Sequence, residues 1–140
     1  MFSVKSLAVT ACVAAALTVA GMALAQNVST GVYSPAQVAR GADLYAAQCA
    51  RCHGASMEGL DVAPPLTGGT FLSHWTGQPL AALATRVRTT MPIDKPGTLG
   101  QAASADLVAS ILDANGYPAG KADLPPGNAA LGAMTLDAPK

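Results

Sequence analysis

The sequence predicts a small all-α domain, and three features of its 140 residues support this fold class. Apolar side chains recur at intervals of three and four residues in three segments, as on one face of a helix. The stretches between these segments are rich in Gly and Pro, which favour loops. The chain is also short enough to form one domain. The expected helices run from Ser34 to Cys49, from Pro79 to Arg88 and from Ser104 to Asn115.

The N-terminal segment has the features of a secretory signal peptide (residues 1–25). Lys5 supplies a positive charge, an uncharged apolar run extends from Leu7 to Gly21, and Ala23-Leu24-Ala25 places small residues where a signal peptidase cuts. We therefore expect cleavage after Ala25 and export to a bacterial periplasm. The uncharged residues from Leu7 to Ala25 could just span a bilayer, so retention as a membrane anchor is the alternative.

The remainder of the chain divides into a lead, a domain and a tail. The polar lead, residues 26–33, is expected to be mobile. The helical domain covers residues 34–120. The tail, residues 121–140, is rich in Ala, Gly and Pro and is expected to be loosely ordered. The chain has eight basic and eight acidic residues, and it has no basic patch that would suggest binding to nucleic acid.

The first expected helix begins at Ser34, whose hydroxyl can cap it, with Pro35 at the first helical position. Gly41 lies inside this helix, where it costs about 1 kcal/mol relative to Ala. A glycine at this position suggests the close approach of another helix. The apolar stripe of this helix consists of Val38, Ala42, Tyr45 and Cys49.

The second and third expected helices have similar signals. Arg86 and Arg88 near the end of the second helix suit the negative pole of its dipole. Ser104 is the expected cap of the third helix, and Asn115-Gly116 is expected to end it. Their apolar faces consist of Leu80, Leu83 and Val87 in the second helix, and Leu107, Val108, Ile111 and Leu112 in the third.

The most informative motif is the pentapeptide Cys49-Ala50-Arg51-Cys52-His53. C-x-x-C-H is the attachment pattern of c-type haem. Two thiols three positions apart can each form a thioether with one haem vinyl group, and the adjacent His can coordinate the iron. Because Cys12 leaves with the signal peptide, neither thiol has a distant Cys with which to form a disulfide.

Two other uses of the Cys pair fit the sequence less well. A thioredoxin-like redox pair follows a strand in a βαβ unit, whereas the residues before Cys49 predict a helix. A structural zinc site takes four ligands, but the mature chain offers only Cys49, Cys52, His53 and His74, without a second paired cluster. The sequence therefore predicts one covalently attached haem.

The order of these motifs resembles the class I cytochrome c family over about Ser34 to Gly120. The resemblance implies a cytochrome c-like helical domain wrapped around one covalently bound haem, and an electron-transfer protein rather than an enzyme. It is carried by Gly41 and Tyr45 before the pentapeptide, by Pro64-Pro65-Leu66-Thr67-Gly68 after it, by Arg86-Val87-Arg88-Thr89-Thr90-Met91-Pro92, and by Asp106-Leu107-Val108-Ala109 to Gly116.

The second iron ligand decides the chemistry, and the candidates are Met57, His74, Met91 and Met134. Met57 is too close to His53 for its loop to pass around the haem edge, and Met134 lies in the tail. In the family the distal ligand is a Met followed by Pro in a loop between two helices, which implies His53 and Met91 as the axial pair. His/Met ligation raises the reduction potential. His74, or an open or water-filled position, is the alternative.

The resemblance assigns three further residues to haem binding. Pro64 matches a proline whose carbonyl accepts a hydrogen bond from the axial His and so orients the ring. Leu66 matches a residue that packs on the haem. Trp75 either donates a hydrogen bond to a propionate or is an ordinary core Trp.

The stretches that start at Met91-Pro92 and at Asn115-Gly116 resemble cytochromes associated with bacterial dehydrogenases, including quinoprotein (PQQ-dependent) enzymes. We therefore expect a soluble periplasmic shuttle that takes single electrons from a dehydrogenase and passes them towards a terminal oxidase or another cytochrome. One alternative is a haem module with an open iron site that binds a gas or acts as a peroxidase. Another is a fixed cytochrome subunit of a larger complex. Contact with a membrane is expected only if the signal segment is retained.

Overall fold

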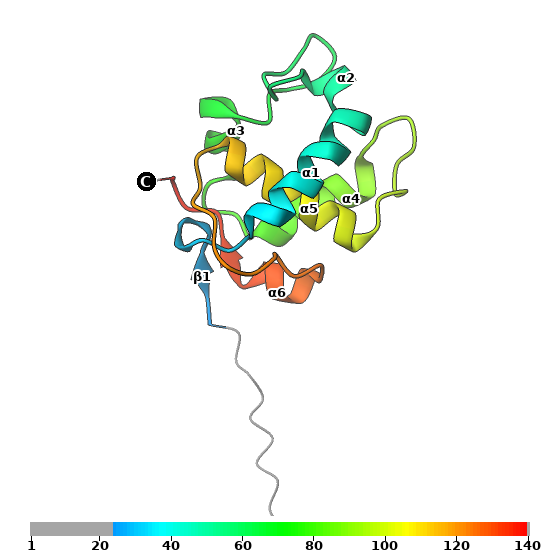
Figure 1. Ribbon diagram of the computed structural model, residues 1–140. Coiled ribbons are helices and arrows are strands. Elements are labelled where there is room, and N and C mark those ends of the chain that lie inside the picture. Colours follow the sequence, from blue (N-terminus) through cyan, green and yellow to red (C-terminus); the bar gives the residue numbers. More distant parts are fainter. Residues whose placement is uncertain (1–23, 140) are drawn as a thin grey trace, which may run out of the picture.

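The computed structural model describes residues 24–139, and nearly all of the expected signal peptide lies outside this range. The described chain is mostly helical, as predicted (Figure 1). The helices are α1 (Pro35–Gln48), α2 (Ala50–His53), α3 (Gly68–Trp75), α4 (Leu80–Thr90), α5 (Gln101–Ala114) and α6 (Asn128–Gly132). The described chain also contains a short 3₁₀ helix, η1 (Val28–Thr30), and two short strands, β1 (Gln26–Asn27) and β2 (Met134–Thr135).

Helices α1 and α5 form the central helix pair, and Figure 1 shows them crossing. They meet at Gly41, where a Cβ atom would lie 1.9 Å from the backbone oxygen of Asp106 and 2.9 Å from Cβ of Ser110. Real Cβ atoms do not approach other atoms this closely. The close helix approach predicted from Gly41 is therefore confirmed.

The expected helix starts are correct for α1 and need correction for α5. Ser34 caps α1, because its Oγ accepts a hydrogen bond from the backbone N–H of Gln37 at 3.1 Å. In contrast, α5 begins three residues before Ser104, with Gly100 as its cap. The Ser104 hydroxyl lies inside the helix and donates to the carbonyl of Gly100 at 2.9 Å. The sequence suggests a cap at Ser104 because serine often occupies that position.

The lead and the tail differ most from expectation, because both are packed onto the domain. Strands β1 and β2 pair in parallel, and the Gln26 N–H donates to the Ala133 carbonyl at 2.9 Å. In the tail, Leu124 binds the buried side chain of Gln37 through its backbone N–H, at 2.6 Å, and its carbonyl, at 3.2 Å. The apolar anchors of these two segments are buried: Val28, Tyr33, Leu124, Leu131 and Leu136.

The packed lead and tail cover one end of the molecule, and loops form the other end. Figure 1 shows β1 and α6 at the opposite end from α2 and the loop that follows it. Helix α6 packs against α4, and β2 lies beside β1. No helix between residues 24 and 139 combines the length and the apolar character needed to cross a lipid bilayer.

Candidate haem-attachment site

The two thiols of the C-x-x-C-H motif lie on the turn that joins α1 to α2. Cys49 ends α1, and its carbonyl accepts hydrogen bonds from the N–H groups of Cys52 at 3.1 Å and His53 at 3.0 Å. One helical turn thereby places both sulfur atoms and the His53 ring on neighbouring positions. Both Cys residues are partly buried free thiols, available for thioether bonds.

The environment of Cys49 differs from that of a catalytic thiol. Burial raises the pKa of the Cys49 thiol above its ordinary value, and the nearby Cys52 raises it further. Catalytic thiols instead have lowered pKa values, because the thiolate is the nucleophile. Across residues 24–139, no three His, Cys, Asp or Glu side chains come together as a group that could hold a metal ion.

The ring of His53 is buried and has a fixed orientation. Its Nδ1 atom lies 2.8 Å from the carbonyl oxygen of Pro64, which is the contact that the resemblance implies. A carbonyl oxygen can only accept, so Nδ1 carries the proton and donates it. The other ring nitrogen, Nε2, therefore has the free lone pair that an iron ligand requires.

Hydrogen bonds from buried groups hold the loop that follows His53. The Tyr45 hydroxyl donates to the carbonyl of Gly54 at 2.5 Å, and the Gly59 N–H donates to the carbonyl of His53 at 2.7 Å. Burial, with smaller contributions from Cys49 and Glu58, raises the pKa of Tyr45 to about 12, so its hydroxyl is neutral at physiological pH. Tyr45, which is one of the residues that carry the resemblance, thus stabilises this loop.

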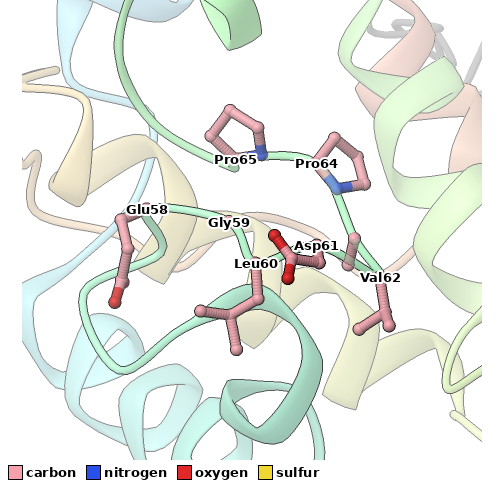
Figure 2. A pocket seen from close by; sticks show the side chains of 8 residues that line it. Glu58, Gly59, Leu60, Asp61, Val62, Pro64 and Pro65 are labelled. Carbon is pink, nitrogen blue, oxygen red and sulfur yellow. The ribbon is translucent and has the colours of Figure 1, made fainter.

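The turn from residue 58 to residue 65 doubles back on itself, so that Pro64 and Pro65 lie across from Gly59 (Figure 2). Gly59 has a φ of +78°, and a Cβ atom there would lie 2.5 Å from the nitrogen of Pro65. Only glycine fits this position. The turn delivers the Pro64 carbonyl to His53.

The side chain of Asn115 ties the segment after Pro64 to the end of α5. Its Nδ2 donates to the carbonyls of Leu66 at 2.9 Å and Ile111 at 2.8 Å, and its Oδ1 accepts from the N–H of Gly68 at 3.1 Å. The sequence indicates Asn115 as a helix end and as part of the resemblance, but not as a tie to Leu66 and Gly68. Its role depends on two segments that are distant in sequence, so no local pattern indicates it.

Met91 lies at the C-terminal end of α4, in extended backbone immediately before Pro92. Its N–H donates to the carbonyl of Val87 at 3.2 Å, which closes the helix. A residue before proline favours extended backbone, so the sequence ends the helix here and starts the loop at Met91. The Met91 side chain is partly buried.

The other candidates for the distal position have different environments. Met57 is a buried core residue, whereas Met134 lies in β2, at the end closed by the lead and tail. His74 is exposed on α3, and its ring meets the ring of Trp75 edge-on at 4.9 Å. Helix α3 was not predicted, because it is short and begins with two glycines.

Several large apolar side chains on the segments after the motif are covered only in part. Leu66 and Trp75 pack against the core but remain partly exposed, as do Leu72 and Val87. The donor set, the oriented His53 and these partly exposed side chains together suit a covalently attached haem.

The family model for subunit III of cbb3-type cytochrome c oxidase matches residues 36–110. The chain belongs to this family of c-type cytochromes. The match spans α1, the Cys49–His53 motif, Met91 and most of α5. The haem c cofactor predicted from C-x-x-C-H is thereby confirmed, as are the cytochrome c-like fold and the general function in electron transfer.

The cytochrome is also similar to a chain of the sulfane dehydrogenase SoxCD from Paracoccus pantotrophus, with 30% sequence identity and a TM-score of 0.49. The similarity covers 58% of the cytochrome and 44% of that chain. The cytochrome thus corresponds to less than half of the SoxCD chain. No match was found among the curated proteins.

Proposed function

We propose that this cytochrome is a periplasmic carrier of single electrons, with His53 and Met91 as the axial ligands of its haem iron. The bound haem supplies the one-electron change between ferric and ferrous iron. The hydrogen bond between His53 Nδ1 and the Pro64 carbonyl is the observation that carries the proposal. It leaves Nε2 as the metal-binding atom, next to two free thiols that can anchor the cofactor.

The residues of the chain position the cofactor and set its potential. Cys49 and Cys52 would anchor it, the Pro64 carbonyl orients the His53 ring, and Leu66 and Trp75 would exclude water from it. The thioether sulfur of Met91 is a soft, neutral ligand that stabilises ferrous iron and raises the reduction potential. With His53 and Met91 both bound to the iron, no vacant position would remain for an external ligand.

We infer that the electron donor is a dehydrogenase and that the acceptor is a terminal oxidase or another cytochrome. The resemblance to dehydrogenase-associated cytochromes supports the choice of donor. The signal peptide predicted from the sequence supports a location in the periplasm. Equal numbers of acidic and basic residues favour modest electrostatic steering. Leu60 and Val62 in the turn of residues 58–65, and Ile93 in the loop after Met91, are exposed. These apolar side chains suit a small, transient contact with a redox partner.

A fixed subunit of a larger complex is the less favoured function. An apolar tail free to contact another subunit would favour it. The tail leucines are buried within this domain instead, with Leu131 at 1% and Leu136 at 0% exposure. That part of the support for a fixed subunit is therefore lost.

Visible spectra of the purified protein, oxidised and reduced, with and without carbon monoxide, test the proposal. We expect a low-spin reduced spectrum, a weak far-red sulfur-to-iron band when oxidised, and no response to carbon monoxide. Met91→Ala should keep the haem attached, abolish the far-red band and lower the potential sharply. A high-spin spectrum that shifts with carbon monoxide would favour an open iron site instead.

A further inference from the structure

We propose that Arg51 and Asp94 form a latch that holds the Met91 loop against the haem-attachment turn. The latch is the ion pair between the guanidinium of Arg51 and the carboxylate of Asp94, at 2.6 Å. Arg51 lies between the two cysteines of the motif, and Asp94 follows Met91 by three residues. The inference rests on the proposed ligation of iron by Met91.

The Met91 loop, residues 91–100, has few other means of staying in place. Residues 93–98 are exposed, with Ile93 at 76%, and Leu99 is the first buried residue after Met91. The hydrogen bonds in the middle of the loop are internal, from the N–H of Lys95 to the Pro92 carbonyl and from Thr98 to the Lys95 carbonyl. The middle of the loop is therefore held by its own turn and by the latch.

The two partners of the latch differ in rigidity, so the rigid partner, Arg51, restrains the loop that carries Asp94. Arg51 lies within the hydrogen-bonded turn of α2, on a segment whose two cysteines are bonded to the cofactor in the mature protein. Asp94 lies on the exposed loop. The same junction brings Gln48 at the end of α1 beside Pro92 and Lys95, around a shallow pocket. The pair therefore restrains the loop and, through it, Met91.

The expected effect is modest, because both partners are largely in water. The side chain of Arg51 is 60% exposed and that of Asp94 is 43% exposed. Ion pairs of this kind contribute little, so their loss should raise the fraction of open loop by about two- to fivefold. If Met91 binds the iron as proposed, an open loop would leave that position free for an external ligand.

The test measures the rate at which imidazole binds to the oxidised holoprotein, followed by stopped-flow absorbance. We expect Arg51→Gln and Asp94→Asn each to raise this rate by about two- to fivefold, and the double variant to raise it no further than the larger single change. Lys95→Gln on the same loop and Asp61→Asn on the opposite loop serve as matched controls and should bind imidazole as the unmodified protein does. Added salt should reduce the difference between the unmodified protein and the latch variants.

The outcomes separate the latch from the proposed ligand. If the far-red band is present and Met91→Ala removes it, but Asp94→Asn binds imidazole at the unmodified rate, the latch is wrong and the ligand assignment remains. Equal acceleration by Lys95→Gln also overturns the latch, because loop charge alone would then explain it. If Met91→Ala leaves the spectrum unchanged, both the ligand assignment and the latch are wrong. Asp94→Asn leaves the C-x-x-C-H motif intact, so haem attachment is preserved in this variant.

Discussion

Substituting Gly41 by alanine should destabilise the cytochrome through the central helix pair. The added Cβ would lie 1.9 Å from the Asp106 carbonyl oxygen, whereas real Cβ contacts are at least about 3.0 Å. Helices α1 and α5 would therefore have to separate by about 1 Å. The obstacle is backbone in the middle of a helix, so no side-chain rotation can relieve it.

Two opposing free energies set the size of the effect. Alanine improves the helix propensity of α1 by about 1 kcal/mol. Forcing packed elements apart costs about 1–3 kcal/mol and sometimes more. With backbone as the obstacle we take the upper end, so the free energy of unfolding should fall by about 2 kcal/mol.

Urea unfolding of the oxidised holoprotein, followed by far-UV circular dichroism and by haem absorbance, measures this change. The midpoint should fall while the slope with urea stays constant. Gly69→Ala in α3 is the matched control, because its Cβ would meet no atom within 4 Å. An unchanged or raised midpoint for Gly41→Ala would refute this account of the helix crossing.

Three further outcomes follow from the contacts of the described residues. Asn115→Ala should lower the unfolding free energy by about 1–3 kcal/mol, because it leaves backbone groups unpaired; urea titration checks this, and a value near zero contradicts it. Leu136→Ala should cost about 2–5 kcal/mol in the same assay, and a neutral result would mean that the tail is not packed. Hydrogen bonds from Ser34 and, to a smaller extent, Arg40 lower the pKa of Asp123. The ionised Asp123 therefore stabilises the fold fully above the ordinary carboxyl pKa of about 3.9, and this stabilisation is lost as pH falls through the lowered pKa. The stability difference between the unmodified protein and Asp123→Asn should therefore vanish in acid, and a difference that persists at low pH would contradict this.

The parts of the structure that were predictable are those with a local sequence signal. Ser34-Pro35 indicated the start of α1 because capping and proline geometry act within one turn. Gly41 indicated the helix crossing because an interior glycine weakens a helix unless something requires its small size. The pentapeptide indicated the cofactor because its chemistry depends on residues within five positions of one another.

The parts that were not predictable depend on contacts between distant segments. The lead and tail contain few apolar residues at regular spacing, yet single anchors such as Val28 and Leu136 are fully buried. Their burial comes from pairing with each other and with α4, which no local pattern encodes. The same reason explains why the Arg51–Asp94 pair, which joins helix α2 to the distant Met91 loop, had no signal in the sequence.

The distribution of burial connects the fold to the cofactor. At the end closed by the lead and tail, the apolar side chains are fully covered by protein, as Leu80 and Leu136 are. At the end that carries the motif, Leu66 and Met91 remain partly exposed although both are apolar. Those are the residues that the resemblance assigns to haem. Because covering apolar surface stabilises a fold by about 25 cal/mol per Å², the attached haem completes the core at this end. The apoprotein should therefore be markedly less stable than the holoprotein.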